Sequence, residues 1–236
     1  MKGVLKIMFV ISKREFFSLF KSIKSIIVIA ILLATAYYSS KFSNVLTNVI
    51  DFTADEMNYV HTIGLLSLLL LFGQLFVLGL SHDCINRETH ERTMRFLVTR
   101  TSRSSIMFGK FLGIVLFWTV CVTISFLIIS IFAKQFDFFS FFQVMSLLIY
   151  QISLTVLLST IIPKPGITMF LGILLGIAYP IFGMWITFTS NEWVSWLKFV
   201  TPFYYLEHDN YLFLIINILA AFLLFISAII FKRREF

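Results

Sequence analysis

The polar segment 81–110 holds the side chains that come closest, by type and spacing, to a chemical site. Its sequence is SHDCINRETHERTMRFLVTRTSRSSIMFGK. His82, Cys84 and His90, with the acidic residues around them, could be taken as zinc ligands, but their spacing matches no standard zinc pattern. The segment therefore predicts no metal site.

The sequence offers no nucleotide site either. Gly109-Lys110 lacks the earlier glycine of a phosphate-binding loop, and Phe111 stands where that loop needs a hydroxyl. The sequence also lacks an H-E-x-x-H zinc motif and any aspartate pair or serine–histidine pair deep in an apolar stretch. We therefore predict a protein that is not an enzyme and binds no cofactor. Cys84 and Cys121 are predicted as free thiols, since neither position favours a disulfide.

The same segment has features of a docking surface. Glu88 and Arg92 stand four residues apart, an acid-to-base spacing that supports a helix. Phe96 and Leu97 then place an apolar pair among charges, which is typical of contact with a partner protein. Three hydroxyl residues could cap the helix that follows: Ser102, Ser104 and Ser105.

Six long runs without Asp, Glu, Lys or Arg must position this segment. A helix needs about 20 apolar residues to cross a bilayer core of roughly 30 Å, and a helix satisfies its own backbone hydrogen bonds there. The shortest run can be extended by Ile23 and a snorkelling Lys24. The sequence thus predicts an all-α integral membrane protein with a single transmembrane domain, 1–236. Its predicted spans are 25–40, 62–80, 111–133, 143–162, 166–190 and 211–231.

The basic residues predict the orientation of these spans. With the N-terminus in the cytoplasm, 16 of the 19 Lys and Arg residues are inside and only Lys41, Lys134 and Lys198 are outside. Both termini are therefore expected in the cytoplasm, and the membrane is expected to be the bacterial plasma membrane. The net charge of +7 then indicates contact with anionic headgroups of membrane lipid rather than with nucleic acid.

Residues 1–24 are predicted to form an amphipathic helix that lies along the membrane interface. Apolar positions recur at helical spacing, so one face can enter the lipid while the other meets anionic headgroups. The apolar arc comprises Leu5, Met8, Phe9, Phe16, Leu19 and Ile23. The basic arc comprises Lys2, Lys6, Lys13 and Lys24, with Arg14 and Lys21 beside it.

The segment 191–210 interleaves aromatic and charged residues. Because Trp and Tyr prefer the membrane–water boundary, we expect an extracellular re-entrant segment with short helices broken near Pro202. In the fifth span, Gly172 and Gly176 predict close helix packing and Pro180 predicts a kink. The aromatic residues of the re-entrant segment are Trp193, Trp196, Phe199, Phe203, Tyr204 and Tyr205.

In order and spacing, the segment 81–110 resembles the loop between the second and third helices of type-2 ABC-transporter permeases. That loop has an acidic residue, Gly-Thr, two leucine-like residues, Pro, Ser-Arg and then Gly-Lys. Arg92 here stands where Gly is usual and Arg100 where Pro is usual, which leaves the ends of the docking helix open. The matching residues are Glu88, Thr93, Phe96-Leu97, Ser102-Arg103 and Gly109-Lys110, followed by Thr201-Pro202-Phe203-Tyr204-Tyr205-Leu206 and the basic terminus Lys232-Arg233-Arg234.

The resemblance implies the transmembrane subunit of an ATP-driven ABC exporter. Two permease subunits, identical or paralogous, would pair, and each would dock an ATPase subunit that binds ATP and Mg²⁺. Closure of the ATPases would push the coupling loops, so the loop residues would act mechanically rather than catalytically. The residues at or near the ATPase contact would be Glu88, Glu91, Arg92, Thr93, Phe96 and Leu97.

The composition of the spans suggests the cargo. Aromatic and aliphatic walls without charge suit a hydrophobic or amphipathic substrate, and we expect an amphipathic peptide. The lack of charge argues against an ion-coupled carrier. The most polar span residues are Gln74, Gln151 and Asn217, of which Asn217 is expected to make an interhelical hydrogen bond. Two alternatives stay open: an immunity or scaffold protein that sequesters a toxic peptide, and a membrane-embedded lipid-modifying enzyme.

Overall fold

The computed structural model describes residues 2–49, 60–99, 101–189, 192–207 and 211–234. Within these ranges the chain is built of helices and contains no strand, so the predicted all-α fold is confirmed. The longer helices are α1 (Lys2–Phe20), α2 (Ile23–Val49), α4 (Ile63–Ser81), α7 (Arg103–Ala133), α8 (Phe138–Ile161), α9 (Pro165–Phe188) and α12 (Leu214–Arg233). The shorter ones are α5 (Asn86–His90), α6 (Met94–Val98), α10 (Glu192–Ser195), η1 (Trp196–Val200), α11 (Pro202–Glu207) and η2 (Tyr211–Phe213).

Six helical segments among the described residues are long and apolar enough to cross a membrane. Each overlaps one predicted span, so the prediction of six candidate spans is confirmed. Several boundaries differ. Polar residues continue two helices beyond their apolar parts, so that α2 runs past Lys41 to Val49 and α7 begins at Arg103 rather than Phe111, and α8 begins at Phe138 rather than Gln143. The six segments are Ile23–Ser43, Ile63–His90, Arg103–Ala133, Phe138–Ile161, Pro165–Phe188 and Tyr211–Arg233.

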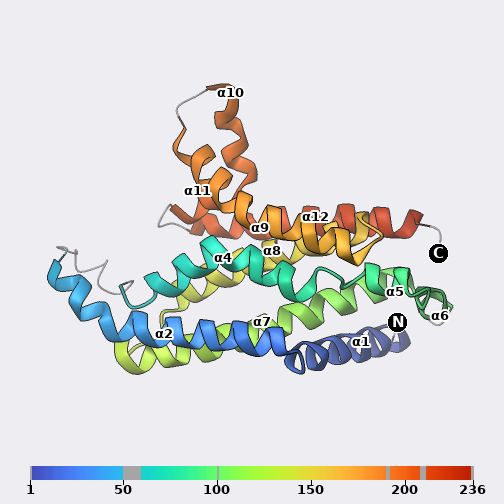
Figure 1. The fold of residues 1–236 in the computed structure, drawn as a ribbon, viewed down its shortest axis with the longest axis horizontal. Helices are drawn as coiled ribbons and strands as arrows, with labels where there is room; N and C mark the ends of the chain where they lie inside the picture. Colours follow the sequence, from blue (N-terminus) through green and yellow to red (C-terminus); the bar gives the residue numbers. More distant parts are fainter. Residues whose placement is uncertain (1, 50–59, 100, 190–191, 208–210, 235–236) are drawn as a thin grey trace.

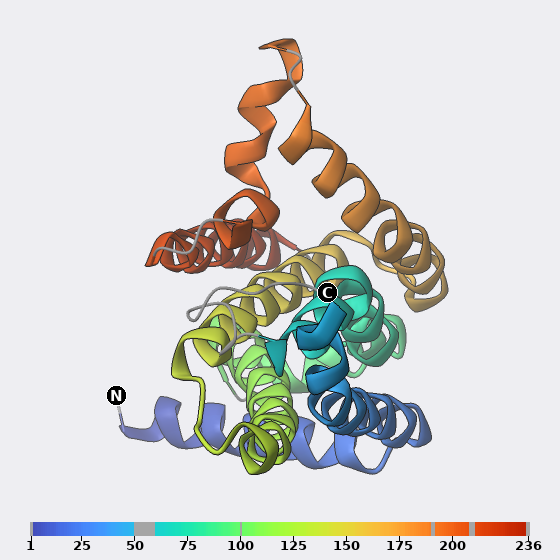
Figure 2. The ribbon, with the colours of Figure 1, turned by 90° about the vertical axis from the view of Figure 1, so that its left-hand side faces the viewer.

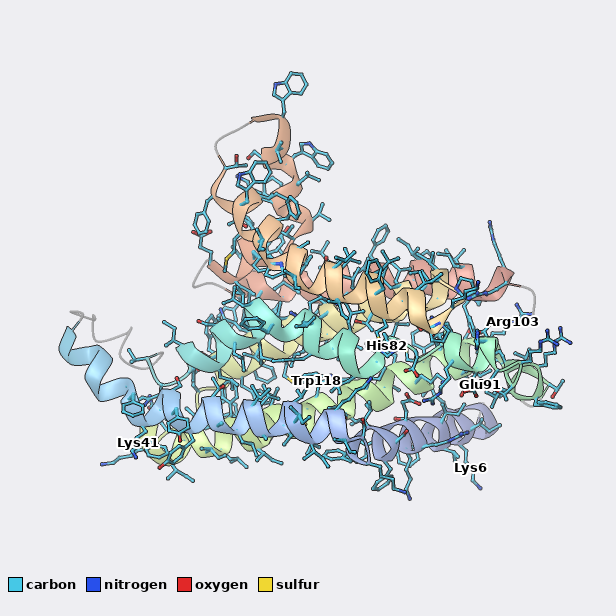
Figure 3. The ribbon with its side chains drawn as sticks, viewed as in Figure 1. Lys6, Lys41, His82, Glu91, Arg103 and Trp118 are labelled. Carbon is cyan, nitrogen blue, oxygen red and sulfur yellow. The ribbon has the colours of Figure 1, made fainter. Side chains whose placement is uncertain are left out.

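Both chain termini lie at one end of the bundle, and α5 and α6 lie at the same end (Figure 1). Glu91 and Arg103 mark this end, whereas Lys41 lies at the opposite one (Figure 3). An even number of spans brings the two termini to one side. We call this the α5–α6 end.

Helix α8 lies at the centre of the bundle and packs against α4, α7 and α12. Amide and hydroxyl side chains form hydrogen bonds between it and its neighbours, as polar side chains do between membrane helices. Asn217 makes the interhelical hydrogen bond expected of it. The bonds are Gln74 Nε2 to Thr155 Oγ1 (3.3 Å), Gln151 Nε2 to the Leu69 carbonyl oxygen (3.2 Å) and Asn217 Nδ2 to Ser146 Oγ (2.8 Å).

Helix α1 lies crosswise to the spans, most of which Figure 2 shows nearly end-on, and packs against α7. Two glycines of α7 let the backbones approach closely. A Cβ atom at Gly109 would lie 2.9 Å from the Met8 carbonyl oxygen, and one at Gly113 would lie 2.7 Å from the Ser12 carbonyl oxygen. Any larger residue at these positions would force the two helices apart.

The apolar arc predicted for α1 does not form one continuous lipid-facing surface. Leu19 is buried in the bundle core, whereas Phe9 is exposed. The reason is that α7 covers part of the circumference of α1, on the side that carries Ser12 and Glu15.

The predicted glycine pair packs α9 closely against α4 within the same chain. A Cβ atom at Gly172 would lie 3.3 Å from Leu78 Cδ2, and one at Gly176 would lie 2.9 Å from Leu75 Cα. The close packing expected from this pair is therefore confirmed. The helix continues through Pro180.

Replacing Gly176 by leucine is expected to lower the free energy of unfolding by about 1–3 kcal/mol, as overpacking of a close contact does. The nearest atom is backbone of Leu75 and cannot rotate away. Gly79→Leu is the matched control, because a Cβ atom at Gly79 would meet nothing within 4 Å. Thermal unfolding in detergent would measure the difference, and equal melting temperatures of the two variants would contradict this packing.

The end of α9 leaves the bundle and forms, with α10, η1 and α11, a projecting arm (residues 181–189 and 192–207; Figures 1 and 2). The arm is held together by aromatic packing: the ring of Phe203 lies over Gly183 and 5.4 Å from the ring of Tyr179. The break expected near Pro202 is present, since η1 ends at Val200 and α11 begins at Pro202. The depth of these short helices in a membrane stays a prediction.

Candidate functional site

The polar residues between α4 and α7 fold into two single-turn helices, α5 and α6. We call residues 82–102 the α5–α6 segment. The segment ends at Ser102, whose side chain accepts a hydrogen bond from the Ser105 backbone N–H at 3.2 Å. This cap, one of the three predicted, fixes the start of α7.

Lys110 of α7 anchors the segment from within. Only 2% of this residue is exposed. Its Nζ donates to the Cys84 carbonyl oxygen at 2.6 Å and lies 2.9 Å from Glu88 Oε1 and 4.0 Å from Glu15 Oε2. Because a buried ammonium group is strongly unfavourable unless it is paired, these contacts join α1, α5 and α7 around one charge.

Buried contacts on two further sides hold the segment in place. The Ser159 Oγ of α8 accepts the backbone N–H of Ile85 at 3.0 Å and that of Asn86 at 3.3 Å. The Asn86 side chain donates to Thr168 Oγ1 at 2.6 Å, which ties the segment to α9. Met94 of α6 is buried in the main core. A segment that is polar in sequence is thus fixed to four long helices.

The outer face of the segment is open. Phe96 is 74% exposed although it is a large apolar residue. Glu91, Arg92 and Thr93 are exposed beside it, and Arg95 adds a second exposed positive charge. An apolar side chain ringed by charges is the pattern of a protein contact.

Arg92 adopts the left-handed conformation, with φ 59°. This conformation favours glycine, the residue that the resemblance places here, and it ends the helical turn of α5. The predicted helical pair of Glu88 with Arg92 is therefore wrong: the helix ends at His90, and Glu88 pairs with Lys110 instead.

The six residues predicted at the partner contact divide into two groups. Four are exposed, as described above. Glu88 is mostly buried against Lys110, and Leu97 is half-buried and packs on the main core. Thr93 Oγ1 donates to the Glu88 carbonyl oxygen at 3.3 Å and so links the two groups.

Burial raises the pKa of the Glu15 carboxyl, although Lys110 and Arg87 act in the opposite direction. A raised pKa in the folded chain stabilises folding fully below the ordinary carboxyl pKa, and this contribution is lost as the pH rises through the raised value. Arg87 also lies 3.5 Å from Asp83, so its positive charge acts on both the Asp83 and the Glu15 carboxyl groups.

Glu15→Gln is accordingly expected to make the melting temperature less dependent on pH and to leave the neutral-pH stability equal to or above that of the wild type. The measurement is thermal unfolding of both proteins from about pH 4 to about pH 8, where carboxyl groups with ordinary or raised pKa values titrate. A pH profile steepened by the substitution would contradict the effect of burial on Glu15.

The residues predicted for the arm also divide by exposure. Trp193 is 89% exposed and Trp196 is exposed beside it, whereas Pro202, Phe203 and Tyr205 are buried. The Tyr205 hydroxyl donates to the Phe199 carbonyl oxygen at 2.8 Å. Lys198 Nζ lies 5.3 Å from the ring centre of Tyr204. The buried residues therefore hold the arm together, whereas Trp193, Trp196 and Phe199 are exposed on its outer surface.

Sequence reasoning missed the residues that anchor the segment. Lys110 was expected to lie in the loop, outside any span, yet it is buried inside α7. Glu15 lies on α1 among basic residues, which gives no sign of a partner on another helix. The sequence feature that could have indicated the anchor is Lys110 itself, because it is a single charged residue between Phe108-Gly109 and Phe111. The sequence indicates Arg103 only as part of the Ser-Arg motif, whereas in the structure its guanidinium donates to the Lys232 carbonyl oxygen at 2.7 Å and holds the end of α12.

The fold and the site define a class: an all-α, multi-pass membrane protein with a polar segment anchored on a buried lysine at the end where both termini lie. The chain belongs to the DUF2705 family, described as a protein of unknown function, whose model matches residues 25–236. The match includes the α5–α6 segment and the arm but not α1. No curated protein matches the sequence.

Proposed function

We propose that this protein is the transmembrane subunit of an ATP-driven ABC exporter, and that the α5–α6 segment is the surface on which a separate ATPase subunit docks. One observation carries the proposal: an exposed Phe96 stands on a segment whose own anchor, Lys110, is buried. A loop that only connected two spans would need no such internal support. The resemblance of the segment to permease coupling loops supports the same conclusion.

The anchoring supplies a mechanical role. A push on Phe96 would be passed through α6 and α5 to Glu88 and Lys110, and hence to α7 and α1. In this view Glu91, Arg92, Thr93 and Phe96 touch the ATPase, while Glu88 and Leu97 hold the segment rigid. ATP and Mg²⁺ belong to the partner, and a second permease subunit would complete the path.

The proposal requires the α5–α6 end to face the cytoplasm of a bacterium, as the basic residues predict. Cysteine labelling tests this, because both native cysteines are free and buried. A membrane-impermeant thiol reagent is expected to label Phe96→Cys only in opened cells and Phe138→Cys, at the opposite end of the bundle, in intact cells. Labelling of Phe96→Cys in intact cells would overturn both the orientation and the docking proposal.

The cargo is proposed to be an amphipathic peptide, supported by the aromatic surface of the arm and the uncharged outer faces of the spans. The test is ATP turnover by the co-purified complex with added peptides, lipids or drugs. Stimulation by peptides alone supports peptide export. A protein that binds peptide but never co-purifies with an ATPase would be a sequestering protein instead. Hydrolysis of ATP by this chain alone would end the proposal.

A further inference from the structure

A groove of about 320 Å³ runs between α1 and α7 on the outer surface of the bundle. Aromatic side chains of α1 and aliphatic side chains of α7 form its walls. They are Phe9, Phe16, Phe17, Leu116 and Val120, and all but Phe16 are exposed. The groove is distinct from the docking face, since it shares no residue with the α5–α6 segment.

Lys13 is the single charged residue that lines this groove. It is exposed and forms no ion pair in the described part of the chain. The nearest acid along α1, Glu15, faces Lys110 instead. Lys6, two turns earlier on the same side of the helix and also exposed, adds to the positive charge. The groove therefore carries positive charge that no ion pair among the described residues offsets.

The two helices give the groove a direction. Helix α1 crosses at the α5–α6 end, whereas α7 runs along the bundle (Figure 2). Leu116 and Val120, one turn apart on α7, continue the apolar wall away from Lys13 along the span. A ligand that fits has an anionic group beside Lys13 and a hydrocarbon chain along α7.

We infer that this groove binds one anionic phospholipid, with its phosphate at Lys13 and an acyl chain against Leu116 and Val120. A zwitterionic lipid would bind less tightly than an anionic one, because no acidic residue lines the groove to pair with its cationic group. The bound lipid would fill the space beside the close glycine contact of α1 with α7. The inference requires only membrane phospholipid, and its test does not depend on any ATPase.

The test uses the purified full chain in detergent, titrated with phosphatidylglycerol or with phosphatidylcholine, and bound lipid is counted by native mass spectrometry. We expect one phosphatidylglycerol to bind in preference to phosphatidylcholine. Lys13→Gln is expected to weaken phosphatidylglycerol binding about fivefold, the contribution of one basic residue at a membrane surface, and to leave phosphatidylcholine unchanged. Val120→Trp fills the groove and is expected to weaken phosphatidylglycerol binding as well.

Lys41→Gln is the matched control, since Lys41 is exposed at the opposite end of the bundle. Its binding of phosphatidylglycerol is expected to equal that of the wild type. Lys13 is exposed, so its loss does not threaten the fold. Equal affinity of the wild type for the two lipids overturns the inference. So does phosphatidylglycerol binding that survives Lys13→Gln, or that falls equally in Lys41→Gln.

Discussion

Replacing Lys110 by methionine is expected to lower the free energy of unfolding by about 3–5 kcal/mol, the usual effect of removing one partner of a buried ion pair. Methionine keeps the apolar length of the lysine side chain, so the loss reports on charge. Glu88 would be left mostly buried with no cation, and the Cys84 carbonyl oxygen would lose its donor. Denaturant or thermal unfolding in detergent measures the change.

The double variant Lys110→Met/Glu88→Leu separates charge from packing. Because an apolar pair of similar volume can replace a buried ion pair at little cost, most of the lost stability should return. Lys164→Met, at an exposed lysine, is the control and should have little effect. A single Lys110→Met variant as stable as the wild type would show that this lysine does not anchor the segment.

Replacing Phe96 by aspartate is expected to weaken binding of the partner ATPase at least about 30-fold, the effect of losing a residue that dominates an interface. The substitution puts a charge where the proposal places an apolar pocket of the ATPase. The stability of this chain should not change, because Phe96 is 74% exposed. Co-purification and the ATP turnover of the complex are the two measurements.

Phe138→Asp is the matched control, a 65% exposed phenylalanine at the start of α8, at the opposite end of the bundle. It should leave ATPase binding unchanged. Arg92→Glu reverses a charge beside Phe96 and is expected to weaken binding as well. ATPase binding that persists through both Phe96→Asp and Arg92→Glu would remove the docking assignment.

The helical class and the six candidate spans could be predicted because they depend on local properties. Apolar runs of sufficient length have one stable backbone solution in lipid, whatever their neighbours are. The pair Gly172 and Gly176 likewise predicted a close helix contact, and α9 makes this contact with Leu75 and Leu78 of α4. Span boundaries were less predictable: α7 begins at Arg103, because an N-cap, and not the first uncharged residue, starts a helix.

The candidate site could be predicted only in part. Phe96 was recognisable as an apolar residue in a charged loop, and its exposure agrees with that interpretation. The partner of Glu88 could not be predicted. The sequence alone does not distinguish a pair with Arg92, four residues away, from a pair with Lys110 on another helix. The positive φ of Arg92 decided the matter by ending the turn before such a pair could form.

The sequence by itself determined that this chain forms six apolar helices, with its polar chemistry gathered in the segment between two of them. Hydrophobicity and chain length decide this, and both can be read along the chain. Only the tertiary structure decided that Glu15, Glu88 and Lys110 meet, because burial of a charge depends on which helices cross and how closely. The glycines Gly109 and Gly113 permit that crossing, and their effect appears only when α1 lies against α7.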